Sequence, residues 1–564
     1  MLEFIIHNII FFSILLPSGY LLGKYISENF NPNLKTTSKL QFFFEKIEDF
    51  ILKILSVDPS HQMTAKEYTW VLISTNIVLF LFSIVILKFQ DILPYRGSFS
   101  QKLDLPLILH ISSSLITNTC QVHHIPELHL THLSNFFLMP LLMLYSSATG
   151  IAVAISVIRG ITQNKIGNAY VDLVRAMIRV LLPLSTLLTL IFTSLGVPNS
   201  IKDTITITTL ENIKQNIIIG PLAAFEAIKM LGENGLAAFN ANSAHPFENP
   251  SYITNFLQLI SILIIPVALI YTLGFWLKNI KQSNMTLIVL IAVLIFESFT
   301  TTYLEINGNH SINKTLNSAN LPNWTGKETR LGITASSIFS SYISNVSGAT
   351  NSALETYHPL TNLIGLFNLS NQSIFGVQGF GTVFTINFIL YTAFLVGLML
   401  GKTPEVFGKR IEKKEIILSS ILLLLNPILV LFGIIIISHL NPEKYSSIYE
   451  QVHYYTQIFY ELSSAAASNG SGLERLNDNN DSWNIITSII MLIARYGALT
   501  SMIFLGEAFG NKPTISTNRG IFKTDNFTFS FIFLFMSIIS TLLIYLPFFV
   551  LGPITEFLLY NNHV

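Results

Sequence analysis

Four tracts of small polar residues in this sequence have the composition needed to replace the water around a dehydrated cation. Backbone carbonyls and hydroxyl oxygens do this without a fixed charge that would trap the ion. Each tract follows a short apolar segment, and the C-terminal end of a helix there would carry partial negative charge toward the cation. One Asn-Gly pair is only a turn signal. The prediction of a cation site therefore depends on the occurrence of four such tracts. The tracts are Thr117-Asn118-Thr119-Cys120-Gln121, Glu233-Asn234-Gly235-Leu236-Ala237, Asn345-Val346-Ser347-Gly348-Ala349 and Ser468-Asn469-Gly470-Ser471-Gly472.

The composition indicates that membrane-spanning helices position these tracts. Hydrophobic residues make up 51% of the chain and charged residues 11%, with a mean hydropathy of +0.55, whereas about a quarter of a soluble domain is charged. A helix needs about 20 mostly apolar residues to cross a bilayer. We expect about ten such spans, near residues 4–23, 68–89, 133–158, 171–198, 252–277, 284–304, 377–400, 415–439, 483–508 and 527–551.

The segments that carry the tracts are too short to span and lie between two spans each. They cover residues 106–119, 221–235, 331–348 and 452–472. Irregular backbone at membrane depth is tolerated only where protein or a water-filled cavity receives it, so we expect four re-entrant pore loops. The prediction is an all-α integral membrane protein with about ten transmembrane helices in four pseudo-symmetric helix/pore-loop/helix repeats. It forms one domain, 1–564, with repeats at 68–158, 171–277, 284–400 and 415–508 and extra helices at 4–23 and 527–551.

Basic residues alternate between the loops and predict the orientation, because Lys and Arg stay on the cytoplasmic side. The loops at 24–66, 159–165, 278–281, 402–414 and 512–523 are rich in them, and each follows an odd-numbered span. Both termini are therefore expected outside the cytoplasm. The start of the chain lacks a basic n-region and a small-residue cleavage site, so we interpret it as a retained first helix. The segment 31–67 favours a cytoplasmic interfacial helix over a flexible loop.

Composition also excludes several function classes. Lys plus Arg and Asp plus Glu both number 32, so no basic excess attracts nucleic acid. The single cysteine, Cys120, excludes an intramolecular disulfide and any multi-cysteine metal site. No nucleotide-binding, phosphorylation, nucleophile-elbow or HExxH motif is present. We expect no catalytic residues in this chain, and the energy for transport must come from elsewhere.

Longer runs around the tracts match one known family nearly letter for letter. They are EAIKMLGENGLAAFNANSAHPFENP from Glu226 to Pro250, GNAYVDLVR from Gly167 to Arg175, GKETR from Gly326 to Arg330, KTPE from Lys402 to Glu405 and SSAAASNGS from Ser463 to Ser471. From about Val57 to the C terminus, the sequence resembles the potassium-translocating (potassium-binding) A subunit of the bacterial Kdp P-type potassium-transporting ATPase.

The resemblance implies a fold of the potassium-channel-like superfamily and a non-catalytic subunit of an ATP-driven uptake pump. Such a subunit binds extracytoplasmic potassium in one filter and passes it to its partner. It implies potassium as the bound ion and no organic cofactor in this chain. The implied partners are a P-type ATPase B subunit that uses ATP and magnesium, a small C subunit and, as a further candidate, a short F peptide, in the lipid of the bacterial inner (plasma) membrane. The implied filter residues are Thr117, Asn118, Thr119, Asn234, Gly235, Ser347, Gly348, Asn469 and Gly470.

The tracts also depart from the family pattern. The family's TNTNWQ reads TNTCQV from Thr117, its TNGGG reads Glu233-Asn234-Gly235-Leu236-Ala237, and its SSAANNNGS has Ala467-Ser468 in place of two asparagines. Two alternatives therefore stay open beside the pump subunit. One is a stand-alone potassium channel or symporter of the same superfamily, and the other is a degenerate, non-transporting assembly subunit. The Glu233 carboxylate either binds cations more tightly than carbonyls do or faces an outer vestibule.

Three further features of the sequence place ionisable side chains in or near the predicted membrane region. Arg495 lies in the middle of a span, where a cation is costly, and the resemblance agrees that it is a pore or gate candidate; a structural pairing with a neighbouring helix is the alternative. Glu297 favours an interhelical hydrogen bond over transport. The histidines of the first outward loop indicate a polar vestibule, and we expect no metal other than potassium. These histidines are His123, His124, His129 and His132.

Overall fold

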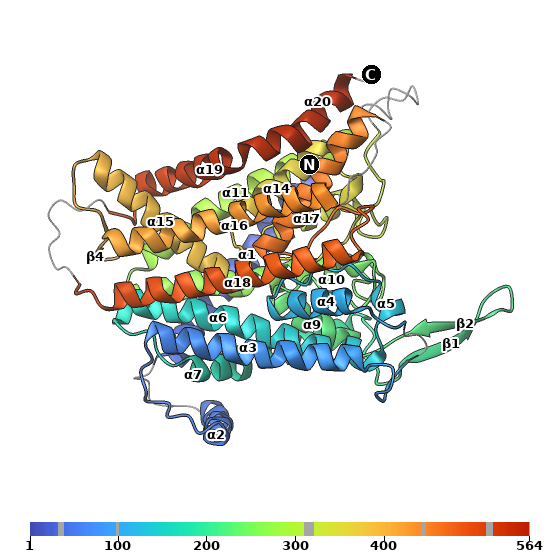
Figure 1. The fold of residues 1–564 in the computed structure, drawn as a ribbon, viewed down its shortest axis with the longest axis horizontal. Coiled ribbons are helices and arrows are strands. Elements are labelled where there is room, and N and C mark those ends of the chain that lie inside the picture. The colour runs from blue at the N-terminus through green and yellow to red at the C-terminus, as the bar shows by residue number, and fades with distance from the viewer. Residues whose placement is uncertain (32–38, 98–100, 309–320, 441–446, 515–522, 563–564) are drawn as a thin grey trace.

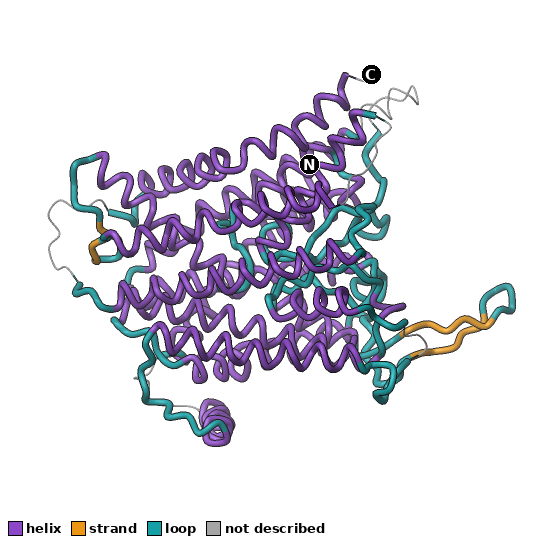
Figure 2. Tube along the Cα trace, in the orientation of Figure 1, coloured by secondary structure: helices purple, strands orange, loops and turns teal. Residues whose placement is uncertain are grey.

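The computed structural model describes residues 1–31, 39–97, 101–308, 321–440, 447–514 and 523–562 (Figure 1). Two basic residues of the predicted cytoplasmic loops, Lys35 and Arg519, lie outside these ranges. Helices make up nearly all of the regular structure, as the tube view shows (Figure 2). The predicted all-helical membrane architecture is confirmed, with two small hairpins as the exception.

Within the described ranges, ten helices are long and apolar enough to cross a membrane. Three of them are interrupted by a π-turn, at Ser134–Leu138, Ala176–Leu181 and Val550–Ile554. Each predicted span overlaps one of these helices, and the ends differ by a few residues. The spans are α1 (Leu2–Asn29), α3 (Ala65–Lys88), α6 (Met139–Gln163), α7 (Ala169–Arg175) with α8 (Leu182–Ser194), α10 (Tyr252–Leu277), α11 (Ile280–Asn307), α15 (Phe380–Met399), α16 (Lys413–Leu440), α18 (Asp481–Gly510), and α19 (Phe527–Phe549) with α20 (Thr555–Asn562).

Four helices that do not span precede the polar tracts, where the sequence predicted them. They are α4 (Leu105–Ile116), α9 (Leu222–Leu231), α13 (Gly332–Ile343) and α17 (Ile448–Ala467). Each packs against spanning helices: α4 and α17 against α18, α9 against α10, and α13 against α11. We call these four the pore helices.

Most of the remaining elements lie toward the two ends of the bundle, whereas α14 (Pro359–Ser370) packs inside it against α11 and α17 (Figure 1). The predicted interfacial helix is α2 (Lys39–Ile54), which lies beneath one end, across the direction of the spans (Figure 1). At the opposite end a hairpin of β1 (Thr204–Thr208) and β2 (Lys214–Ile218) projects from the bundle (Figure 1). We call these the α2 end and the hairpin end. The other short elements are α5 (Pro126–His129), β3 (Glu405–Val406), β4 (Lys409–Arg410) and the single 3-10 turns Asn242–Ala244 and Leu354–Thr356.

Burial separates the central helices from the peripheral ones. In the most apolar stretch of α6 and of α10, 83% of residues are buried, against 28% in α1, α3 and α16. The peripheral helices present large apolar side chains outward, as lipid-facing helices do. Side-chain caps fix where several helices begin: Thr64 with Glu67 forms a capping box on α3, and Ser251 with Thr254 forms one on α10.

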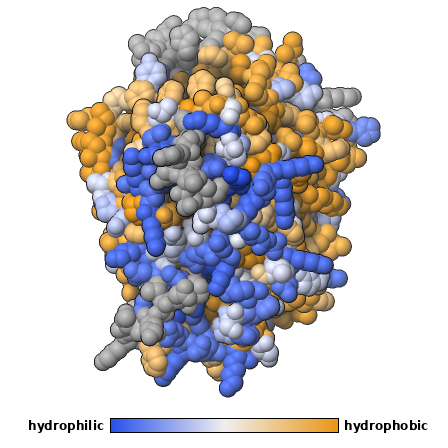
Figure 3. All heavy atoms as spheres, turned by 90° about the vertical axis from the view of Figure 1, so that its left-hand side faces the viewer, coloured by the Kyte–Doolittle hydropathy of each residue, from blue (hydrophilic) through white to orange (hydrophobic). Residues whose placement is uncertain are grey.

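The α2 end is the polar, basic end of the molecule. Hydrophilic residues gather over the middle and lower part of this face, with apolar side chains along its upper and right-hand edges (Figure 3). The KTPE and GKRI motifs form the small β3–β4 hairpin here. Lys409 donates to the backbone carbonyls of Gly160 and Phe509, at 3.2 and 2.6 Å, and so joins the C-terminal ends of α6 and α18. A cation satisfying terminal helix carbonyls is a stabilising arrangement.

Candidate functional site

Three of the four pore helices end in the same backbone turn. Asn118, Glu233 and Ser468 each take a left-handed conformation, with φ of 61°, 53° and 57°. In each case the following residue donates its N–H to the carbonyl five residues back, which closes a Schellman turn. Within the third tract no residue has a positive φ, and Ser347 instead donates to Ile343. The four tracts therefore have three equivalent loop starts and one different one.

The four tracts meet in a closed ring. A Cβ on Gly235 would lie 2.6 Å from the Cα of Gly348, and a Cβ on Gly348 would overlap the carbonyl carbon of Gly470. A Cβ on Gly470, where φ is +96°, would overlap the carbonyl oxygen of Thr119. Cys120 closes the ring, because its thiol donates to Asn234 Oδ1 at 3.3 Å. Only glycine permits these backbone approaches.

Asparagine side chains fasten neighbouring tracts to one another. Asn118 donates to the carbonyl of Gly232 at 3.1 Å, and Asn469 donates to the carbonyl of Ser344 at 3.0 Å. The side-chain Oδ1 of Asn118 in turn accepts from the hydroxyl of Ser146 of α6 at 2.7 Å. These amides are engaged in cross-links between tracts. The groups left to coordinate an ion are therefore mainly backbone carbonyls.

A buried charge cluster lies behind the second tract and comes from the longest matching motif. Lys229 donates to Glu226 at 3.2 Å, Glu248 at 2.8 Å and Asn242 at 2.6 Å, and the lysine and both carboxylates are buried. Asn242 then donates to the carbonyl of Gly235 at 2.9 Å. The motif thus connects the pore helix, the ring and the chain that leaves it. Its charges are satisfied internally, as burial requires.

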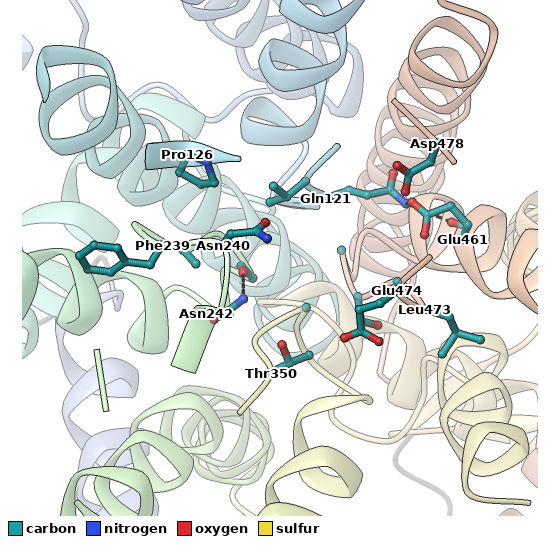
Figure 4. Close-up of a pocket in the computed structure, with 17 residues that line it drawn as sticks. Gln121, Pro126, Phe239, Asn240, Asn242, Thr350, Glu461, Leu473, Glu474 and Asp478 are labelled. Atoms are coloured by element: carbon teal, nitrogen blue, oxygen red, sulfur yellow. Dashed lines mark hydrogen bonds between the residues drawn. The ribbon is translucent and has the colours of Figure 1, made fainter. Parts of the chain in front are cut away.

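A cavity of about 190 Å³ opens over the ring at the hairpin end, and we call it the vestibule (Figure 4). Ring glycines from the second, third and fourth tracts line its floor, together with Gln121 from the first. Its walls carry the carboxylates Glu461, Glu474 and Asp478. Burial raises the pKa of each of these three carboxyls. The vestibule is therefore lined by three carboxyl groups on its way to the four tracts, and burial disfavours their charged form.

Two charged residues lie near the ring but outside the vestibule. Glu233 is buried, does not line the vestibule, and both its carboxylate oxygens are without a hydrogen-bond partner among the described residues. Arg495 stacks its guanidinium on Phe380, 3.8 Å from the ring centre, and donates to the carbonyl of Ser146 at 3.4 Å. A Cβ on Gly150, one turn further along α6, would lie 3.5 Å from Arg495 Nη2. Arg495 therefore lies on the α2 side of the ring, where its charge acts on Glu233.

Comparisons with known proteins agree with this architecture. A family model described as the potassium-transporting ATPase A subunit matches residues 9–558. The chain belongs to the potassium-transporting ATPase A subunit family. Relatives named potassium-transporting ATPase potassium-binding subunit include one from Nostoc sp., 39% identical over 95% of both chains, and one from Geobacillus kaustophilus, 35% identical over 95% of this chain and 96% of its own. The potassium transporter TrkH from Vibrio parahaemolyticus shares the fold, with a TM-score of 0.53 at 14% identity, covering 88% of this chain and 99% of that one.

For this A subunit family member, the structure brings the predicted filter residues together but gives them different local roles. Gly235, Gly348, Gly470 and Thr119 form the ring contacts described above. The hydroxyl of Thr117 donates to the carbonyl of Ser113 at 2.7 Å and so lies within its own loop. The remaining contacts of the predicted set are Asn118 and Asn469 to neighbouring tracts, Asn234 to Ser147 at 3.2 Å, and Ser347 Oγ to the N–H of Ala349 at 3.2 Å.

Sequence reasoning missed several residues that shape the site. Glu461 lies in the fourth pore helix, and its carboxylate contacts Gln121 and His123 of the first loop. An acidic residue close to the polar tract, in a pore helix predicted to enter the membrane, was the available signal, since such residues are costly there. Glu297, expected to make an interhelical hydrogen bond, accepts from Asn345 of the third tract at 3.4 Å. It therefore supports the one tract that lacks the left-handed turn.

Proposed function

We propose that this chain selects potassium for an ATP-driven uptake pump, binding the ion in the ring of four tracts. The observation that carries the proposal is the closed backbone contact of Gly235, Gly348 and Gly470 with Thr119 beneath a vestibule lined by carboxyl groups. Potassium-binding relatives at up to 39% identity support the choice of ion. The proposed ligands are backbone carbonyl and hydroxyl oxygens of Thr117, Asn118, Thr119, Asn234, Gly235, Ser347, Gly348, Asn469 and Gly470.

Selection in this ring works by exchanging water for fixed oxygens. A carbonyl ring replaces the hydration shell of potassium without binding it so tightly that it cannot leave. The cross-links from Asn118 and Asn469 hold neighbouring tracts at one spacing. In the second tract Leu236 and Ala237 follow Gly235, so only one glycine of the family's three-glycine run is present. The cation site is accordingly centred on the level of the three glycines.

Arg495 is the proposed gate on the α2 side of the ring. A fixed guanidinium in the dry interior raises the energy of a second cation beside it. Glu233, where the second tract departs from the family pattern, is buried away from the vestibule that leads to the ring.

Energy and direction come from partners in this proposal. The partners are a P-type ATPase B subunit, which uses ATP and magnesium, a small C subunit and a short F peptide. The chain is one domain in the bacterial inner membrane, with the four repeats placed as the sequence predicts. The hairpin end faces outward and the basic α2 end faces the cytoplasm, which places both termini outside.

A stand-alone potassium channel or symporter is the second candidate. The fold shared with the transporter TrkH favours it, because that likeness covers 88% of the chain. The whole-length match to ATPase A subunits and the β3–β4 hairpin built from the KTPE motif favour the pump subunit. The third candidate, a non-transporting scaffold, is favoured by the altered second and fourth tracts.

Growth rescue separates the three candidates. The chain is expressed with its presumed ATPase and small subunits in a potassium-uptake-deficient bacterium at micromolar potassium. We expect rescue by the native chain, and loss of rescue with Gly235→Asp or Gly470→Asp, because each side chain would enter the ring. Membrane insertion of both variants is checked by fractionation and by co-purification with the partner subunits.

The outcomes assign one candidate each. Rescue that disappears when the ATPase is inactivated supports the pump subunit, whereas rescue that persists supports the channel or symporter. Assembly without rescue supports the scaffold. Unchanged potassium dependence in both glycine variants would contradict the assignment of the ring as the potassium site.

A further inference from the structure

A histidine and two carboxylates from different repeats converge at the side of the vestibule. His123 Nε2, of the first outward loop, lies 3.0 Å from Glu461 Oε1 and 3.9 Å from Asp478 Oδ2. One ligand atom from each of the three residues lies within 4.8 Å of the others. Ligand atoms around a tetrahedral zinc ion are separated by roughly 3.3 Å, given bond lengths of about 2.0–2.1 Å. The three groups therefore need only small shifts to surround one ion.

The outer contacts of His123 fix the tautomer that a metal requires. Its Nδ1 lies 2.8 Å from Asn484 Oδ1, and the Asn484 amide nitrogen donates to Asn479 at 3.3 Å, so the amide oxygen faces the imidazole. Nδ1 must then carry a proton. Nε2 donates to the Glu461 carboxylate, and a metal that binds there displaces this proton and takes the Nε2 lone pair. A metal-bound histidine usually has such an acceptor behind it. The ring of His110 stacks on His123 at a centroid distance of 3.8 Å and limits its rotation.

An unused ligand oxygen lies beside the same carboxylate. Gln121 is 2% exposed, its amide nitrogen donates to Glu461, and its Oε1 has no hydrogen-bond partner among the described residues. Gln121, Glu461 and Asp478 all line the vestibule, so an ion reaches them from the water above the ring (Figure 4). Figure 4 shows the Gln121 side chain extending toward Glu461 and Asp478, across the vestibule from Asn240.

We infer that His123, Glu461 and Asp478 form a binding site for a divalent transition cation of the zinc class at the mouth of the ion path. One nitrogen and two carboxylate oxygens are a ligand set that zinc accepts, with Gln121 Oε1 or water in the fourth position. A bound ion adds two positive charges next to the ring and narrows the vestibule. It therefore hinders a second cation that approaches Gly470.

The four histidines of the first outward loop do not gather around one point, and none of them lines the vestibule. His124 and His129 contact edge to face at 6.5 Å, and the backbone N–H of Ile125 donates to His129. Of these histidines, His123 contacts the two carboxylates Glu461 and Asp478, which lie 338 and 355 residues further along the chain. The site exists only because the first and fourth repeats are neighbours in the closed ring.

Zinc binding to the purified complex, with the full chain and its partner subunits, tests the site directly. Isothermal titration with zinc chloride is compared between the native complex, His123→Gln, Asp478→Asn, Asn484→Ala and the control His129→Gln. We expect one zinc ion per native chain, abolished by His123→Gln and weakened by about tenfold or more by Asp478→Asn and Asn484→Ala. His129→Gln, in the same loop, should bind as the native chain does. Size-exclusion elution checks that each variant complex stays assembled.

The block of potassium passage rests on the proposed function and is measured separately. Micromolar zinc should inhibit uptake by the native complex, and the half-inhibitory concentration should rise about tenfold in Asn484→Ala. Equal zinc binding by the native and His123→Gln complexes, or no binding by the native complex, overturns the metal site and leaves a simple ion pair. Binding that is lost in His123→Gln without any block of uptake confirms the site and removes its role in the ion path.

Discussion

The second and fourth pore loops begin with the same backbone turn but are held in place by different means. Behind the second, Lys229 is paired with Glu226 and Glu248, all buried. Behind the fourth, the N–H of Gly470 donates to the hydroxyl of Ser464 at 2.9 Å. Asn469 accepts from the backbone and hydroxyl of Ser471 in the same loop, at 3.1 and 2.6 Å.

This difference shows two ways to fix a backbone at membrane depth. A charge cluster is strongly directional, but it requires every member, because an unpaired buried charge is costly. A loop held by hydroxyl and amide groups is satisfied locally and tolerates changes in its polar members better. The second loop, which retains one glycine of the family's run, has the charged support. The fourth, which keeps Gly470 and Gly472, depends on backbone freedom.

The largest expected effect comes from breaking the charged support. Lys229→Met should lower the free energy of unfolding by about 3–5 kcal/mol, because Glu226 and Glu248 would stay buried without a counter-charge. Thermal unfolding of the purified complex in detergent measures the loss. The double variant Lys229→Met with Glu226→Gln removes one of the stranded charges and should recover part of it. A single variant as stable as the native chain would contradict the view that the cluster fixes the second loop.

The next largest effect is expected from a substitution that disturbs the backbone of the fourth loop. Gly470→Ala should weaken the apparent affinity for potassium by tenfold or more, because its Cβ would overlap the Thr119 carbonyl oxygen and φ is +96°. Gly196→Ala is the matched control: φ there is +98°, but a Cβ would meet nothing within 4 Å. Both share the conformational strain of a side chain at positive φ, so only the first should change the potassium concentration that supports half-maximal growth. Equal effects would assign the loss to strain alone.

The sequence predicted the spans and pore helices well because lipid imposes a simple rule on composition. Runs of about 20 apolar residues became the ten spanning helices, and the four shorter segments became α4, α9, α13 and α17. It did not predict α14, a helix between the third tract and α15. The β1–β2 hairpin was also missed, although Thr204-Ile205-Thr206-Ile207-Thr208 shows the period-two alternation typical of a strand.

The sequence predicted which tracts form the candidate site, but it did not predict which side chains contact one another there. Local composition marks Gly235 and Gly470 as pore-loop residues, but nothing local pairs Glu461 with His123, 338 residues away. Likewise Asn118 and Asn469 looked like ligands, and the structure engages their amides as cross-links between tracts. Such pairings depend on how four repeats close around one axis. A one-dimensional pattern does not specify that closure.

The smallest expected effect comes from the outer start of the fourth pore helix, which a charged histidine holds in place. His453 of α17 bridges Glu355 at 2.6 Å and Glu556 at 3.0 Å. Burial alone would lower the pKa of His453, but the hydrogen bonds and charges of the two glutamates outweigh it and raise the pKa to about 10. The protonated form is thus favoured in the folded chain.

Because this pKa is raised on folding, the stabilisation is fully present below about pH 6.5, the unfolded value, and is lost as the pH rises through about 10. The difference in melting temperature between the native chain and His453→Gln should therefore be largest near pH 6 and shrink toward pH 10. Thermal unfolding at several pH values between these limits measures it. A difference that grows with pH would mean that His453 is neutral in the folded chain. In that case the outer start of the fourth pore helix would be held by uncharged contacts, and the pair of Glu461 with His123 would be the charged support of its inner half.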